Sequence, residues 1–115
     1  MGPEARLESR IAKAVQKLEG LYLKQTGVPG IPDRLVIIPT YHVRIPQTMG
    51  GTETVPYEVE IVPRYFFLEL KAARGRLSEL QKAAIERLRD LGCDARVLIG
   101  SVDVIAFIQE LELMY

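Results

Sequence analysis

The sequence predicts a mixed α/β domain in which helices pack on a central sheet. Apolar residues recur at helical spacing near both ends of the chain, and short apolar runs typical of strands lie between these segments. The 115 residues contain no internal repeat and no linker, which favours a single domain over residues 1–115. The expected order is helix, strand, strand, hairpin insertion, strand, helix, strand, helix.

The first part of the chain is expected to form one helix and two strands. The helix spans residues 4–19, and Gly20 can end it. Strands follow over residues 21–24 and 34–39, separated by a rigid turn at 27–32, where proline fixes φ and glycine permits unusual backbone angles. The apolar positions of the helix are Leu7, Ile11, Ala14 and Leu18.

The middle of the chain is the least regular part. Two stretches with alternating polarity, residues 42–45 and 57–62, predict a long hairpin or flap, inserted at about residues 41–64. The strand over residues 65–71 follows this insertion.

The last part of the chain begins with a helix. Ser78 and Gln81 form a capping-box pattern that starts it, and Gly92 can end it. Its expected apolar side consists of Leu80, Ala84, Leu88 and Leu91. The remaining elements are a strand over residues 95–99 and a helix from Ser101, as its N-cap, to about residue 114.

Composition narrows the class of protein. Fifteen basic residues balance fifteen acidic ones, which argues against a protein that coats nucleic acid nonspecifically. No apolar run approaches the ~18 residues that span a bilayer, and the N-terminus has no apolar signal core, so a cytoplasmic protein is expected. Cys93 is the only cysteine, which excludes an intrachain disulfide and a thiolate-rich zinc site, and it is expected to serve packing.

The strand over residues 65–71 carries the main chemical signal. Because side chains alternate along a strand, Glu69 and Lys71 point to the same face, and Leu68 and Leu70 point to the other. Charges in so apolar a strand are costly unless they are paired or bind a metal. Asp33 precedes the apolar run 35–38, so the sequence has the layout of a metal-dependent nuclease site.

Each of these residues also has a plain structural interpretation. Asp33 is typical of a turn, Glu69 of a cross-strand ion pair, and Lys71 of a strand end that reaches water. Together they meet one chemical demand, because Mg²⁺ takes oxygen ligands from carboxylates, water and substrate phosphate. A neighbouring lysine can hold or deprotonate the attacking water.

Three further polar residues bear on the site. Glu8 lies on the flank of the apolar helix face without a cation at i±3 or i±4, which indicates either a tertiary partner, such as the metal, or a plain exposed glutamate. Gln81 is explained by the capping box, although its amide could also face a metal site at the helix start. His42 is the only histidine and is interpreted as structural.

Basic residues recur along the first helix and in the turn after the strand of Glu69. The helical residues form a narrow stripe beside the apolar face, which is either solvated or faces phosphate. The stripe consists of Arg6, Arg10, Lys13 and Lys17, and the turn contains Arg74 and Arg76.

In combination, the motifs resemble the VRR-NUC family, the virus-type replication-repair nucleases of the PD-(D/E)XK superfamily, in their stand-alone phage or bacterial form. The matching pieces are Glu8, Lys24, Gly-Ile-Pro-Asp-Arg at 30–34, Phe-Leu-Glu-Leu-Lys at 67–71 and Leu-Ser-Glu-Leu-Gln at 77–81. The resemblance covers residues 7–108 apart from the insertion, and it implies a restriction-endonuclease-like mixed central sheet flanked by helices.

The resemblance also implies a site. Asp33 and Glu69 would ligate Mg²⁺ or Mn²⁺ together with the carbonyl of Leu70, Lys71 would orient or activate water, and Gln81 would complete the site. Glu8 would join the metal shell. The expected DNA contacts are Lys24, Arg34, Arg74, Arg76, Arg10 and Lys13.

The expected function is therefore a Mg²⁺-dependent, structure-specific DNA endonuclease that resembles a Holliday-junction resolvase and acts as a homodimer without membrane contact. Relatives of this kind act in phage replication and DNA repair. Cleavage of flap or linear DNA, a DNA-structure-binding module that does not cut, and an α/β interaction domain with a strand ion pair stay open as alternatives, and RNA is not excluded as a substrate.

Overall fold

A computed structural model describes residues 2–25, 27–45 and 57–114. The four strands form one sheet in the order β1-β2-β3-β4, with the first two pairs antiparallel and β3–β4 parallel. The mixed α/β fold with a four-stranded sheet flanked by helices is thereby confirmed. The elements are α1 (Pro3–Lys17), β1 (Leu21–Lys24), β2 (Arg34–Arg44), β3 (Glu58–Lys71), α2 (Glu79–Asp90), β4 (Ala95–Ile99) and α3 (Gly100–Met114). Among the described residues, no helix is long and apolar enough to cross a membrane.

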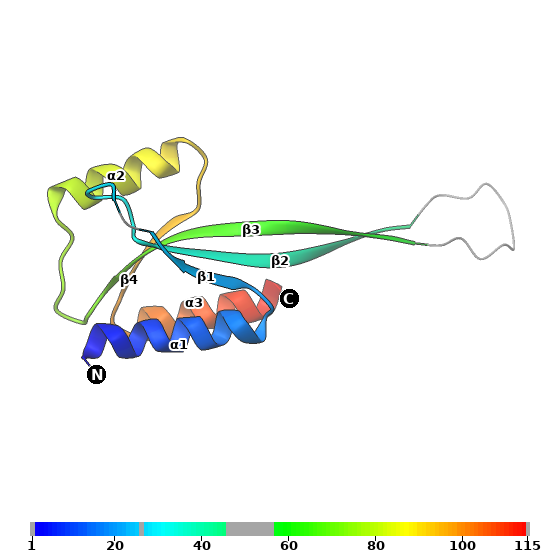
Figure 1. Cartoon of the computed structure of the whole chain (residues 1–115), viewed down its shortest axis with the longest axis horizontal. Coiled ribbons are helices and arrows are strands. Elements are labelled where there is room, and N and C mark those ends of the chain that lie inside the picture. Colours follow the sequence, from blue (N-terminus) through cyan, green and yellow to red (C-terminus); the bar gives the residue numbers. More distant parts are fainter. Residues whose placement is uncertain (1, 26, 46–56, 115) are drawn as a thin grey trace, which may run out of the picture.

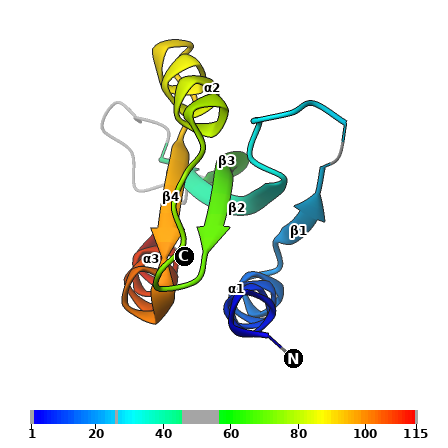
Figure 2. The same cartoon turned by 90° about the vertical axis from the view of Figure 1, so that its left-hand side faces the viewer.

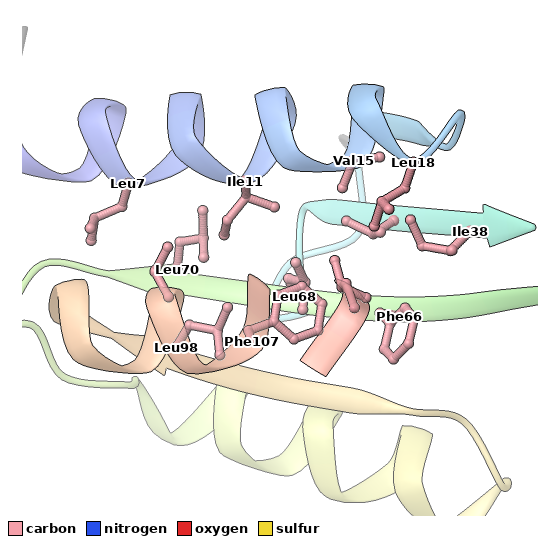
Figure 3. Packing of buried hydrophobic residues seen from close by; sticks show 13 residues of the cluster. Leu7, Ile11, Val15, Leu18, Ile38, Phe66, Leu68, Leu70, Leu98 and Phe107 are labelled. Atoms are coloured by element: carbon pink, nitrogen blue, oxygen red, sulfur yellow. The ribbon is translucent and has the colours of Figure 1, made fainter. Parts of the chain in front are cut away.

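The core lies between the sheet and one pair of helices. Helices α1 and α3 lie side by side on one face of the sheet, and α2 lies on the other (Figures 1 and 2). From α1, the side chains of Leu7, Ile11 and Val15 enter the core at the helical spacing seen in the sequence. They meet alternating strand residues such as Phe66, Leu68 and Leu70 (Figure 3). Each buried side chain of this size contributes roughly 2 kcal/mol from the removal of apolar surface from water.

Strands β2 and β3 continue far beyond their neighbours (Figure 1). Their pairing runs from Arg34–Leu68 to Arg44–Glu58, whereas β1 reaches only Ile37. Strand β4 pairs with β3 only from Phe67 onward. Residues 38–44 and 58–64 therefore form a two-stranded ribbon, called the β-ribbon below. The arms of the expected hairpin are continuations of the two central strands, and its residues 46–56 lie outside the described residues.

The continuation of β2 corrects the expected strand end at Pro39. Pro39 lies directly opposite Pro63 in the register. Opposed residues in a non-hydrogen-bonded antiparallel pair exchange no N–H bonds, so two prolines can face each other there without loss of a ladder bond. A proline in a hydrogen-bonded pair would have removed a ladder bond.

Two helix boundaries differ from the sequence predictions. Helix α1 ends at Lys17, and Glu19, with φ 61°, takes the left-handed conformation expected near Gly20. Helix α3 begins at Gly100, so Ser101 lies inside its first turn and is not the N-cap. Asp103 serves this helix start, because its carboxylate accepts a hydrogen bond of 2.8 Å from the backbone N–H of Ile99.

Helix α2 begins at the predicted capping box, but its buried side coincides only in part with the predicted one. Ile85 is its buried residue, whereas Leu80 and Leu91 are 56% and 62% exposed. Ala84 and Leu88 of the predicted apolar side are half-buried, so the prediction is confirmed at these two positions and is wrong at Leu80 and Leu91. Leu80 instead lies against the backbone of Gly30, where an added Cβ would come within 2.6 Å of Leu80 Cγ.

Candidate active site

The start of β2 and the end of β3 meet at one end of the sheet. Arg34 is paired with Leu68, so Asp33 and Glu69, one residue further on each strand, follow as the next opposed positions. Asp33 is exposed and Glu69 is buried. The strand geometry thus brings two carboxylates that are distant in sequence to the same place.

The carboxylate of Glu69 is held by two neighbours on its own face of the sheet. Its Oε1 atom accepts a hydrogen bond of 2.8 Å from Nε2 of Gln81, and Nζ of Lys71 lies 3.4 Å from the same atom. Burial raises the pKa of Glu69; Lys71 opposes this shift, while the negative charges of Asp33 and Glu4 add to it. A nearby cation would therefore stabilise the ionised form.

Gln81 uses both ends of its side-chain amide. Its Oε1 atom accepts a hydrogen bond of 2.9 Å from the N–H of Ser78, and Ser78 Oγ accepts one of 3.1 Å from the N–H of Gln81. The amide nitrogen is thereby directed to Glu69. The capping box and the contact with Glu69 are compatible, and the start of α2 is joined to the end of β3.

Glu8 has the tertiary partner that its position in the sequence suggested. Its two carboxylate oxygens accept hydrogen bonds of 3.1 Å each from Nε and a terminal nitrogen of Arg34, and Lys24 Nζ lies 3.1 Å away. Burial acts to raise the pKa of Glu8, but Arg34 and Lys24 outweigh it and hold that pKa below its usual range. Arg34 also pairs with Asp33, so one guanidinium links α1 to the start of β2. A role of Glu8 in a metal shell stays a prediction.

The residues expected to contact DNA differ in exposure. Arg10, Lys13, Arg74 and Arg76 are exposed, and the side chain of Lys24 is 63% exposed. Arg34 is only 8% exposed and is engaged by Glu8 and Asp33, which leaves it little access to a phosphate. Arg10 lies on α1 beside a hollow that Ala72 and Ala73 also line, so the stripe and the basic turn approach each other at this end of the molecule.

The donor set suits a hard divalent cation. Asp33, Glu69 and the Leu70 carbonyl would offer only oxygen atoms, which are the ligands that Mg²⁺ and Mn²⁺ prefer. The raised pKa of Glu69, with Asp33 among its causes, shows two carboxylates whose repulsion such a cation would relieve. Within residues 2–25, 27–45 and 57–114, no three side chains of the His, Cys, Asp and Glu types form a metal-binding group, so the proposed set depends on the backbone carbonyl.

One residue near the site was missed by the sequence analysis. The charge of Glu4, in the first turn of α1, acts on Glu69. Its signal was the spacing to Glu8, because residues four apart lie on the same side of a helix. His42 lies in the β-ribbon opposite Glu60, far along the strands from Glu69, and Cys93 lines a hollow beside Phe67.

The fold has a counterpart among solved structures. A structure described as "VRR_NUC domain" is similar to this chain with a TM-score of 0.62 and 24% sequence identity, over 100% of this chain and 99% of that one. No family model and no curated protein matches the sequence. The similarity confirms the fold that the motifs implied.

Proposed function

We propose that this chain is a nuclease of the VRR-NUC family, a metal-dependent endonuclease of the PD-(D/E)XK type that hydrolyses phosphodiester bonds in DNA. The observation that carries the proposal is the group formed by Asp33, Glu69, Lys71 and Gln81 at one end of the sheet. The shared fold with a VRR_NUC domain supports it. We include the whole of residues 1–115 in one nuclease domain, with the insertion at 41–64 as a flap whose described arms continue the two central strands.

Asp33, Glu69 and the Leu70 carbonyl would hold Mg²⁺ or Mn²⁺, with Glu8 near this shell. The bound cation would supply positive charge beside the scissile phosphate. Lys71 keeps its ammonium beside Glu69, with 22% of its side chain exposed, so it can donate to the attacking water or to the charge that develops on a phosphate oxygen. Gln81 fixes the rotamer of Glu69 and so keeps one carboxylate oxygen in place.

The proposed substrate is branched DNA, a four-way junction above all, cut by a homodimer. A two-fold dimer presents two sites to two strands, which is the arrangement that symmetric cleavage of a junction requires. Exposed cations on α1, on β1 and in the turn after β3 would contact phosphates, with those of α1 lining hollows that α3 also borders. They include Arg10, Lys13, Lys24, Arg74 and Arg76.

The proposal is tested with labelled single-stranded, duplex, flap and four-way-junction DNA in Mg²⁺, in Mn²⁺ and in EDTA. We expect paired nicks in the junction, lost in EDTA and in the Lys71→Ala and Glu69→Gln variants while DNA affinity is retained. Lys82→Ala is the matched control, because Lys82 follows Gln81 on α2 but pairs with exposed Glu79 at 3.0 Å. Metal-dependent cleavage of flap or linear DNA would support the nuclease activity and contradict the proposed specificity for four-way junctions.

A second candidate is a module that binds DNA structure without cutting it. The balanced net charge favours specialised over bulk binding. Junction affinity that is independent of metal, with no product from any substrate in a folded sample, would support this candidate and contradict the nuclease.

A further inference from the structure

The two faces of the β-ribbon differ completely in polarity. Strand alternation and the register place every charged side chain of the ribbon on one face, which also contains His42. The other face contains only Pro39, Tyr41, Val43, Val59, Ile61 and Pro63. It continues toward the body of the sheet through the Ile37–Tyr65 and Leu35–Phe67 pairs. This surface, from Leu35–Phe67 to Val43–Val59, is called the apolar face below.

The apolar face is open to solvent in the single chain. Val43, Val59, Ile61 and Tyr65 are 58%, 52%, 61% and 52% exposed. Ile45 and Tyr57, directly beyond the last paired residues, are 77% and 67% exposed. The exposed area of these six side chains is on the order of the 800 Å² that each partner buries in a standard interface, above the largest patch on a typical monomer.

The body end of the apolar face is hollowed. A hollow of about 480 Å³ is lined by Leu35, Phe67, Tyr65 and Pro63 of this face. Its other lining residues are Gly92, Cys93 and the charged pair Arg64 and Asp94. Exposed apolar side chains, with Ile61, Ile45 and Tyr57 the most exposed, thus lie at the far end of the face, and a recess lies at the near end. Such a surface is complementary to itself when one copy is turned end for end.

We infer that the apolar face is the two-fold interface between two copies of this chain. The β-ribbons would pack face to face and antiparallel, so that the far end of each apolar face covers the hollow of its partner. DNA is disfavoured as the occupant, because the apolar face itself has no charged side chain and Arg64, the cation that lines the hollow, lies 3.7 Å from the carboxylate of Asp94. A second copy supplies an uncharged apolar surface of the same length, and an isologous contact requires only one such surface. The assignment rests on the proposed homodimer and names the surface that forms it.

The test is the oligomeric state of the full chain, measured by analytical ultracentrifugation over a range of concentrations. Val59→Lys and Val43→Lys each put a charge on the apolar face at positions more than half exposed, so folding is expected to persist. His42→Lys is the matched control, since it adds the same ammonium one residue away on the opposite face. We expect a wild-type dimer, a dimer in His42→Lys, and dissociation constants raised at least about 100-fold in the two valine variants.

Several outcomes would overturn the inference. These are a monomeric wild type, a dimer that both valine variants leave intact, or a monomer whose Val59→Lys variant loses affinity for DNA or for lipid vesicles. Circular dichroism checks that the variants are folded. Cleavage assays on the same samples keep the two proposals apart, because the dimer is measured without activity: an inactive wild-type dimer that Val59→Lys dissociates would contradict the nuclease and retain the interface.

Discussion

Glu69 is only 6% exposed, and the negative charge of Asp33 acts on its carboxylate. Its hydrogen bond from Gln81 and the ammonium of Lys71 compensate this burial only in part, because the pKa of Glu69 still lies above its usual range. The residue that would bind the metal therefore destabilises the metal-free fold.

Glu69→Gln is expected to raise the stability of the metal-free protein near neutral pH. Because the folded pKa of Glu69 is raised above 4.5, the wild type loses stability as pH rises through that folded value. The neutral amide does not titrate, so the gain in the variant grows with pH and vanishes in acid. Urea unfolding in EDTA at a series of pH values measures this difference.

Glu79→Gln is the control for this measurement, since the Glu79 side chain is 91% exposed. It is expected to leave the pH profile of stability almost unchanged. Parallel profiles for wild type and Glu69→Gln would mean that Glu69 carries no burial penalty.

At the scale of single residues, short sequence motifs identified the candidate site residues. The residues that they contact depend on the tertiary structure. Glu69, Lys71 and Gln81 were found because an Asp/Glu-x-Lys strand and a capping box are short motifs. The burial of Arg34 was not foreseen, because it depends on Glu8, which lies 26 residues away in the sequence. The effect of Glu4 on Glu69 likewise depends on how α1 lies across the sheet.

Among the elements, α2 connects helix capping to the site through one side chain. Gln81→Glu keeps an acceptor for the N–H of Ser78 but removes the amide donor and adds a negative charge beside Glu69. We expect cleavage to fall by at least about tenfold with the helix retained. Circular dichroism and a junction-cleavage assay measure the two effects.

Ser78→Ala is the complementary variant. It removes the cap and should lower the free energy of unfolding by about 1 kcal/mol, while Gln81 can still donate to Glu69. If Ser78→Ala impaired cleavage as strongly as Gln81→Glu, the amide donor would have no separate role.

The loop that precedes Asp33 contacts α2 at Gly30, which lies against Leu80. Gly30 has φ +85°, and a Cβ there would lie 2.6 Å from Leu80 Cγ and 2.9 Å from the Leu80 carbonyl oxygen. Gly30→Ala is expected to lower the free energy of unfolding by more than about 1 kcal/mol and to weaken cleavage, since Asp33 follows three residues later.

Gly27→Ala is the matched control for Gly30→Ala. Gly27 has φ +116°, but a Cβ there would meet no atom within 4 Å. The difference between the two variants in urea unfolding isolates the contact with α2 from backbone strain. Equal losses would mean that the contact with Leu80 is unimportant.

Periodicity in the sequence predicted whether a segment is a helix or a strand. It predicted the ends and the buried faces of these elements less well. The helices and strands were located by their spacing, but the prolines at 39 and 63 hid the length of the two central strands. Each proline is compatible with the pairing because of its place in the ladder, and a register between distant segments cannot be read from one strand. On α2, Leu80 lies against Gly30 and Gln81 bonds to Glu69, and neither contact can be read from the sequence of the helix alone.

For the molecule as a whole, we expect the β-ribbon to serve dimerisation and the globular body to provide the stability of the monomer. The described residues from His42 to Arg44 and from Glu58 to Glu60 are exposed, so they add little to the core of one chain. Replacing residues 42–60 by an Asn-Gly turn should change the free energy of unfolding of the monomer by less than roughly 1 kcal/mol. The same variant should sediment as a monomer.

Thermal unfolding at low protein concentration and ultracentrifugation together measure this separation. A large loss of monomer stability would show that the β-ribbon belongs to the core. A shortened chain that still dimerised would move the interface to the body of the sheet.

The pairing of β2 with β3 also restricts how the length of this region can change. Val59, Ile61, Phe67 and Glu69 are all odd-numbered, and they share one face because strand alternation repeats every two residues. Loss or gain of one residue between Ile61 and Phe67 would turn the far part of the ribbon over relative to the site, unless a bulge absorbed it. Changes of two residues, matched on both strands, would preserve both surfaces. Related chains are therefore expected to differ in ribbon length by even numbers per strand.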